Sequence, residues 1–168
     1  MKKLALVFGL ALMTFSTIQA QRIACVDVVQ ILEGMETYKT AQEELDGTAA
    51  RWQQEMDQMR DEIRGLYNKY QSEMVLLSDD AKSQREDEIM RKEKEMRDFQ
   101  KAKFGPDGAL FKKRQELVRP IQDKVYKAIE DYAAQKGYDF IFDKGGSAGL
   151  LFTNPRYDKT AEVQEKVK

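Results

Sequence analysis

The chain has 168 residues, 34% of them charged, and a formal net charge of −1. This near-balance of charge argues against a nucleic-acid-binding protein, which needs a clearly basic surface. The sequence contains no histidine, so the commonest general base and metal ligand is missing, and we expect a protein that is not an enzyme and that carries neither a cofactor nor a metal.

Residues 1–20 have the features of a secretory signal peptide. Lys2 and Lys3 give a positive start, residues 4–15 are apolar, and Ala20 is a small residue at the expected cleavage point. The apolar stretch is shorter than the roughly 20 residues that a membrane-spanning helix needs. We therefore predict an exported protein, and an uncleaved membrane anchor is the alternative.

A strand is expected within residues 22–29, where apolar and β-branched residues predominate. It contains Cys25, the only cysteine of the chain, so no intrachain disulfide can form. The apolar setting favours a buried structural thiol. A redox-active or intermolecular thiol is the alternative.

From about Val29 to Leu77 the spacing of apolar residues becomes helical. Along the middle of this stretch the spacing alternates between four and three residues, at Leu45, Ala49, Trp52, Met56, Met59, Ile63, Leu66 and Tyr70. This seven-residue repeat places one seam on a helix, and the seam needs a second helix to cover it. Past Tyr70 the repeat drifts, because the next apolar residue is Met74. The two glycines inside the helix, Gly47 and Gly65, predict a pliable arm.

The second helix of the hairpin is expected at residues 81–103. Ser78 is a natural N-cap in front of it, and the helix has few apolar residues near the turn, so we expect a weakly packed tip. Gly105, Pro106 and Gly108 then break the helix, and we interpret them as a hinge.

A third helix is expected from Leu110 to about Lys136, with Pro120 as a kink or joint and Gly137 as its C-terminal cap. Residues 138–143 alternate like a strand, residues 144–149 form a turn, and residues 150–153 suggest a second strand. A short helix follows Asp158. The strands on either side of the arm must meet and close the hairpin at its base.

Such a body is too small to bury all its apolar residues within one chain. The predicted core and self-association residues are Ile23, Cys25, Val26, Phe140, Phe142, Leu150 and Phe152. Association of several copies through this body is the economical solution.

Methionines and aromatic residues along the arm suit a surface that accepts many shapes. The candidate contact residues are Met56, Met59, Tyr67, Tyr70, Met74, Met90, Met96 and Phe99. The alternative is that they fill the seam between the helices, above all Met56 and Met59. Charge is uneven as well, with six basic and two acidic residues in 112–127. This patch suits anionic lipid headgroups or an acidic partner, although a solvated helix face is the simpler interpretation.

Several segments together resemble one known family. They are the signal peptide, the strand from Ile23 to Asp27, the long charged hairpin, the stretch from Lys113 to Ile121 and the stretch from Gly137 to Asp143. In these the chain resembles the Skp (OmpH) family of periplasmic chaperones over essentially the whole mature sequence, most specifically from Lys113 to Asp143.

The resemblance implies a periplasmic homotrimer with a β-rich body and three helical tentacles around a cavity. It also implies an ATP-independent holdase for unfolded outer-membrane β-barrel proteins. The best-known members are strongly basic, whereas this chain is slightly acidic. Contact with the membrane surface or with lipopolysaccharide is therefore the less supported part of what the resemblance implies.

The sequence thus predicts a mainly α fold with a small β body, in which a long antiparallel helical hairpin stands on a short-stranded trimerisation body. The predicted parts are the signal peptide (1–20), the body with the tentacle base (21–36 and 104–168) and the hairpin arm (37–103). The predicted function is a holdase chaperone for unfolded outer-membrane proteins, without nucleic acid as a partner. An envelope structural or adaptor protein that uses the hairpin as a spacer or docking rod is the alternative.

Overall fold

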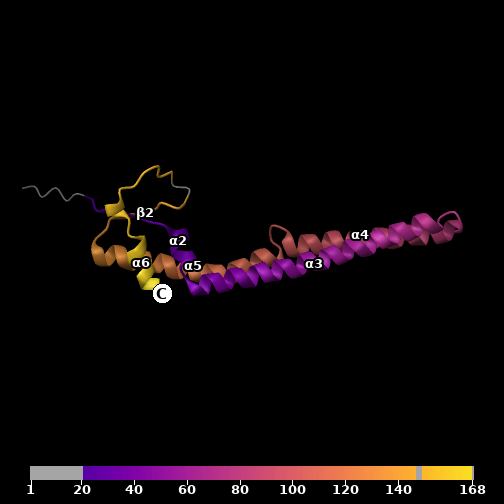
Figure 1. The fold of residues 1–168 in the computed structure, drawn as a ribbon, viewed down its shortest axis with the longest axis horizontal. Helices are drawn as coiled ribbons and strands as arrows, with labels where there is room; N and C mark the ends of the chain where they lie inside the picture. Colours follow the sequence, from indigo (N-terminus) through magenta and orange to yellow (C-terminus); the bar gives the residue numbers. More distant parts are fainter. Residues whose placement is uncertain (1–20, 147–148, 168) are drawn as a thin grey trace, which may run out of the picture.

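The computed structural model describes residues 21–146 and 149–167, and the predicted signal peptide at 1–20 lies outside this range. The chain forms a small body at one end and a long helical arm that projects from it (Figure 1). In chain order the elements are β1 (Ile23–Val26), α2 (Val28–Glu33), α3 (Glu36–Glu73), α4 (Asp79–Phe104), α5 (Ala109–Lys136), β2 (Phe140–Asp143), the 3-10 helix η2 (Pro155–Tyr157) and α6 (Thr160–Val167). The predicted fold class, mainly α with a long hairpin and a small β body, is confirmed.

The body contains a two-stranded parallel sheet that joins the two ends of the chain. β1 pairs with β2 in the register Ile23 to Phe140 and Val26 to Asp143, so the strands before and after the arm do meet. Helices α2, α5 and α6 pack together beside this sheet. Their buried apolar side chains form one core with the end of β1: Val26, Val28, Ile31, Leu32, Met35, Val125, Tyr132, Val163 and Val167.

The outgoing helix is interrupted near its start, where the sequence predicted a continuous helix from about Val29. α2 ends at Gly34, and Met35 adopts an extended backbone and buries its side chain in the core. A Cβ atom on Gly34 would collide with the side-chain amide of Gln164 in α6. That amide is the end of a flexible side chain and can move, so the contact does not require glycine here. The break between α2 and α3 instead accompanies the burial of Met35 in the core of the body.

The arm consists of α3 packed first against α4 and then, nearer the body, against α5 (Figure 1). Three of the buried residues of α3 lie on the predicted repeat: Leu45, Met56 and Ile63. Ala41 is buried ahead of the repeat, and Thr48 is buried in place of the predicted Ala49, which is half-buried. In α4, by contrast, Ile89 alone is buried among the described residues. The seam thus runs out towards the tip, as the sequence predicted.

The tip of the hairpin is a short turn between α3 and α4. α3 ends at Glu73 rather than continuing to Leu77, so Met74, Val75 and Leu76 fall in the turn. Ser78 caps α4 as predicted, because its hydroxyl accepts a hydrogen bond of 3.3 Å from the backbone N–H of Ala81.

The inner return helix α5 runs through Pro120 without a break, so the predicted joint there is wrong. Pro120 lies on the exposed side of the helix. Water can therefore solvate the backbone carbonyl that a proline leaves without its helical partner. Gly137 ends the helix in the left-handed conformation, with φ of 68°, which confirms the predicted cap.

The second strand predicted at residues 150–153 is absent from the described chain, where this segment is irregular. Both edges of β1 are already used, one by β2 and the other by a bridge between Cys25 and Asp158. The segment from Leu150 to Thr153 therefore cannot pair with β1, and in the described chain it does not pair with the outer edge of β2 either. Part of the predicted turn before it, residues 147–148, lies outside the described residues.

Candidate functional surfaces

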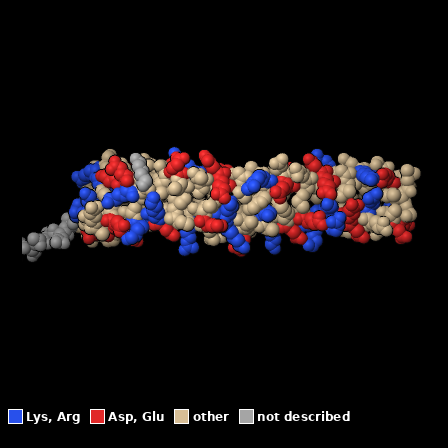
Figure 2. All heavy atoms as spheres, turned by 90° about the horizontal axis from the view of Figure 1, so that it is seen from below, with Lys and Arg blue, Asp and Glu red and all other residues tan. Residues whose placement is uncertain are grey.

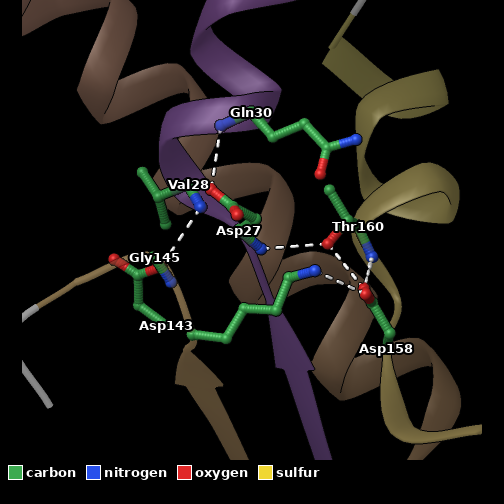
Figure 3. Close-up of polar contacts among 8 residues, drawn as sticks. Asp27, Val28, Gln30, Asp143, Gly145, Asp158 and Thr160 are labelled. Carbon is green, nitrogen blue, oxygen red and sulfur yellow. Dashed lines mark hydrogen bonds and ion pairs between the residues drawn. The ribbon is translucent and has the colours of Figure 1, made fainter. Parts of the chain in front are cut away.

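A cluster of polar side chains ties the start of α2 to the end of β2 and the start of α6 within the body (Figure 3). Asp143, at the end of β2, accepts hydrogen bonds from the backbone N–H groups of Val28 (3.2 Å) and Gly145 (3.0 Å). The Thr160 hydroxyl, at the start of α6, accepts one from the backbone N–H of Asp27 (3.0 Å). The start of α2 is thereby held from two sides, which sets the direction in which the chain leaves the body.

Asp158 is the anionic centre of this cluster. Its carboxylate accepts hydrogen bonds from the Lys144 ammonium (2.7 Å) and from both the hydroxyl (2.6 Å) and the backbone N–H (3.0 Å) of Thr160. Burial raises the pKa of Asp158, but these hydrogen bonds outweigh that effect and bring the pKa to about 2. The carboxylate is therefore charged at neutral pH and stabilises the folded body.

The body exposes most of its predicted association residues. Cys25 and Val26 are buried, the thiol as predicted, whereas the other five lie at the surface of the protomer: Ile23, Phe140, Phe142, Leu150 and Phe152. Phe140 and Phe142 stack with ring centroids 6.3 Å apart. A hollow of about 500 Å³ beside them is lined mainly by apolar groups, including Ile23, Leu150 and Phe152. These side chains therefore form an exposed apolar face on the body, and such faces often mark interaction sites.

Along the arm, the candidate contact residues divide into three groups by their burial. Met56 is buried in the seam, so it is removed from the contact surface: its position on the repeat turns it towards the second helix. Met59, Tyr70, Met96 and Phe99 are half-buried. Tyr67, Met74 and Met90 are exposed.

The two tyrosines of this set are held by hydrogen bonds across the hairpin. The Tyr67 hydroxyl donates to Glu93 (2.9 Å), and the Tyr70 hydroxyl donates to Glu86. These hydrogen bonds raise the pKa of both phenols. Polar contacts of this kind replace the apolar seam in the outer part of the arm.

The most exposed apolar residues of the arm are two that the sequence analysis did not select. Val75 is 88% exposed and Leu76 is 87% exposed, and both lie in the turn at the tip beside Met74. The apolar run directly in front of the Ser78 cap was the signal for them. It was missed because a longer helix would have placed part of that run in the seam.

The three residues that were predicted as a hinge form a tight turn partway along the arm. The Gly108 N–H donates to the Gly105 carbonyl over 2.9 Å, and a Cβ atom on Gly105 would collide with the Lys101 carbonyl. Pro106 is exposed at the turn. The glycines are therefore explained by close backbone packing.

Charges of both signs are interspersed along the length of the arm (Figure 2). Many form pairs within one helix, such as Arg91 with Glu95 (2.6 Å), and two bridge the hairpin: Lys92 with Glu62 (2.7 Å) and Lys113 with Glu44 (2.6 Å).

In the part of the chain that the structure describes, no cluster of ligating side chains suits a metal ion. Within residues 21–146 and 149–167, no helix is long and apolar enough to cross a membrane.

Comparison with known proteins matches this architecture along its length. A family model described as outer membrane protein (OmpH-like) matches residues 22–167, which covers both body and arm. The chaperone protein Skp of Yersinia enterocolitica is 25% identical over 160 residues, which are 95% of this chain and 94% of that protein. The resemblance seen in the sequence is thereby confirmed. The chain belongs to the family of OmpH-like outer membrane proteins.

Proposed function

We propose that the protein is an ATP-independent holdase chaperone of the periplasm that keeps unfolded outer-membrane β-barrel proteins from aggregating. One observation carries this proposal: the arm's apolar seam ends before its tip and leaves Val75 and Leu76 almost fully exposed. A spacer rod would keep its seam to the end. A Skp chaperone among the chain's relatives supports the proposal.

The mechanism needs no chemistry, only many weak contacts. Exposed apolar and aromatic side chains on the arm, among them Tyr67, Met74 and Met90, bind apolar segments of an unfolded chain. While bound, these segments cannot pair edge to edge with one another, which is the step that leads to aggregation. Half-buried side chains add to this contact surface where the two helices of the arm pack less closely: Met59, Tyr70, Met96 and Phe99.

We further propose that three copies assemble through the apolar face of the body. Phe140, Phe142 and Phe152 are exposed in the protomer, and the outer edge of β2 has no partner strand among the described residues. The segment at 150–153 has strand-like residues but pairs with no strand in the described chain. Pairing it with a neighbouring copy would cover both surfaces at once. The three arms would then surround one cavity.

We also propose that Gly105, Pro106 and Gly108 form a joint at which the outer half of the arm changes direction. A Pro106→Gly variant releases the fixed φ angle of an exposed proline, so it should broaden the distribution of maximum dimensions in solution scattering. Pro155→Gly, in the body, is the matched control. Identical scattering from Pro106→Gly and the unaltered protein would count against the joint.

The test of the holdase function is dilution of a urea-unfolded outer-membrane barrel protein into buffer without nucleotide. The chaperone should keep the barrel protein in solution, as measured by light scattering, and sedimentation should show three copies per complex. Rapid aggregation of the barrel protein despite folded, trimeric chaperone would refute the proposal. Stable binding of one folded envelope protein instead would favour the spacer function.

A further inference from the structure

The turn between α4 and α5 carries a hollow that the seam of the arm does not use. Its volume is about 270 Å³, and it is lined by Phe104, Gly105, Pro106, Leu110, Phe111 and Arg114. We call it the mid-arm hollow. Figure 1 shows the turn as a loop that stands off the side of the arm, between the body and the tip.

The walls of the mid-arm hollow are held in place by the arm itself. The Phe104 ring packs edge to face on Trp52 of α3, with centroids 6.1 Å apart. Gly105 also lines the hollow, and it lies too close to the carbonyl of Lys101 to carry a side chain. Arg114 lies four residues after Leu110 and three after Phe111, so its side chain is on the same side of α5 as theirs.

Two side chains of the mid-arm hollow are free to contact a ligand. Phe111 is 44% exposed although it lines the hollow. Arg114 has no ion pair or hydrogen bond with any residue in the described ranges, whereas its neighbour Lys113 is paired with Glu44 over 2.6 Å. A free aromatic ring and a free guanidinium therefore meet at one small concave site.

Among the residues that line the mid-arm hollow, Arg114 is the charged one. Lys101 and Lys112 line a second hollow on the other side of the turn. Asp98 and Asp107 line that second hollow as well, so its charges are balanced, and Asp98 is engaged by Lys94 over 2.6 Å. The guanidinium of Arg114 is therefore the charge that the mid-arm hollow offers to a ligand. A partner that fits must therefore combine an apolar ring with a negative charge.

We propose that the mid-arm hollow binds an aromatic side chain of an unfolded polypeptide while an adjacent acidic side chain of that polypeptide pairs with Arg114. This inference rests on the proposed function and names a recognition element for the same arm. An incoming ring packs against Phe104 and Phe111, which favour edge-to-face or offset contacts. The planar guanidinium can hold a carboxylate with two hydrogen bonds. The site is small and open, so it adds one weak contact to many.

The test uses two labelled, end-blocked peptides, Gly-Ser-Phe-Glu-Ser-Gly and Gly-Ser-Phe-Lys-Ser-Gly, with binding measured by fluorescence anisotropy. The unaltered protein should bind the Phe-Glu peptide about 3- to 10-fold more tightly than the Phe-Lys peptide. Arg114→Glu should reverse that preference, because the new carboxylate repels one peptide and attracts the other. Phe111→Ser should weaken both peptides equally.

Arg119→Glu is the matched control, because it makes the same charge change at an exposed position of α5 that does not line the hollow. It should keep the preference of the unaltered protein. Retention of that preference by Arg114→Glu, or its loss in Arg119→Glu, would overturn the inference. Equal binding of both peptides by a protein that still prevents aggregation would overturn this inference alone, whereas a protein that fails to prevent aggregation counts against the proposed function.

Discussion

Trp52 of α3 and Phe104 at the end of α4 meet edge to face, with ring centroids 6.1 Å apart and planes at 89°. The Lys103 ammonium lies 4.8 Å from the centroid of the Trp52 ring. This contact joins the two halves of the hairpin at the point where the return chain changes from α4 to α5. The contact therefore holds α3 against the returning chain at the turn where α4 ends.

Phe104→Ala should lower the free energy of unfolding by about 1–2 kcal/mol, because a half-buried ring and its aromatic pair are lost. Trp52 is the only tryptophan, so its emission reports this site directly and should shift to the red. Urea unfolding at fixed protein concentration measures both effects. Phe111→Ala, at an exposed ring, is the control, and equal losses in the two variants would contradict the argument.

The body should lose stability in acid through Asp158. The folded pKa of about 2 lies below the ordinary value of 3.8, so the stabilisation is present above pH 3.8 and disappears as the pH falls towards 2. Because the side chain is 30% exposed, we expect a contribution of about 1–2 kcal/mol.

Asp158→Asn should therefore be less stable at pH 7 and should show a shallower loss of stability between pH 5 and pH 2. Thermal unfolding across that range measures the difference. Asp79→Asn, at a fully exposed carboxylate on the tip of the arm, is the control. A wild-type acid profile in Asp158→Asn would show that the cluster does not contribute.

Replacing the apolar tip should separate function from folding. Val75→Ser with Leu76→Ser should change the free energy of unfolding by less than about 0.5 kcal/mol per site, because both side chains are already in water. The same variant should suppress aggregation of an unfolded barrel protein less well. Val29→Ser, on an exposed residue of the body, should leave suppression unchanged. Full activity in the tip variant would remove the tip from the mechanism.

Two glycines should respond to alanine in opposite directions. Gly65 lies inside α3 with open space around it, so Gly65→Ala should stabilise the arm by about 1 kcal/mol. Gly137 has a φ of 68°, so Gly137→Ala should destabilise the protein by about the same amount. Thermal unfolding of both variants is the measurement. A shift of the same sign in both would contradict these conformational assignments.

The repeat from Leu45 to Tyr70 predicted the arm because the apolar seam of a helix depends only on the spacing of residues along the sequence. The caps at Ser78 and Gly137 were predictable for the same reason. What failed depends on distant contacts. The outgoing helix is interrupted where Met35 turns into the core of the body, and that distant packing has no local signal.

The candidate contact residues show the same division. Met56 lies on the repeat and is buried by it, whereas Val75 and Leu76 are exposed only because α3 ends at Glu73. Where a helix ends decides which side chains reach water, and boundaries are the least certain part of a sequence pattern. The segment at 150–153 was predicted as a strand from its composition, but composition does not reveal whether a partner strand exists.

The parallel pairing of Ile23 with Phe140 has a consequence for the order in which the molecule matures. The hairpin forms from neighbouring segments, but the sheet must wait for a strand that emerges after the whole arm. Pairing β1 with β2 costs less conformational entropy once the hairpin has formed, because the hairpin brings the two strands close together. The arm is therefore formed before the body, and the apolar face through which we propose that copies assemble is completed last.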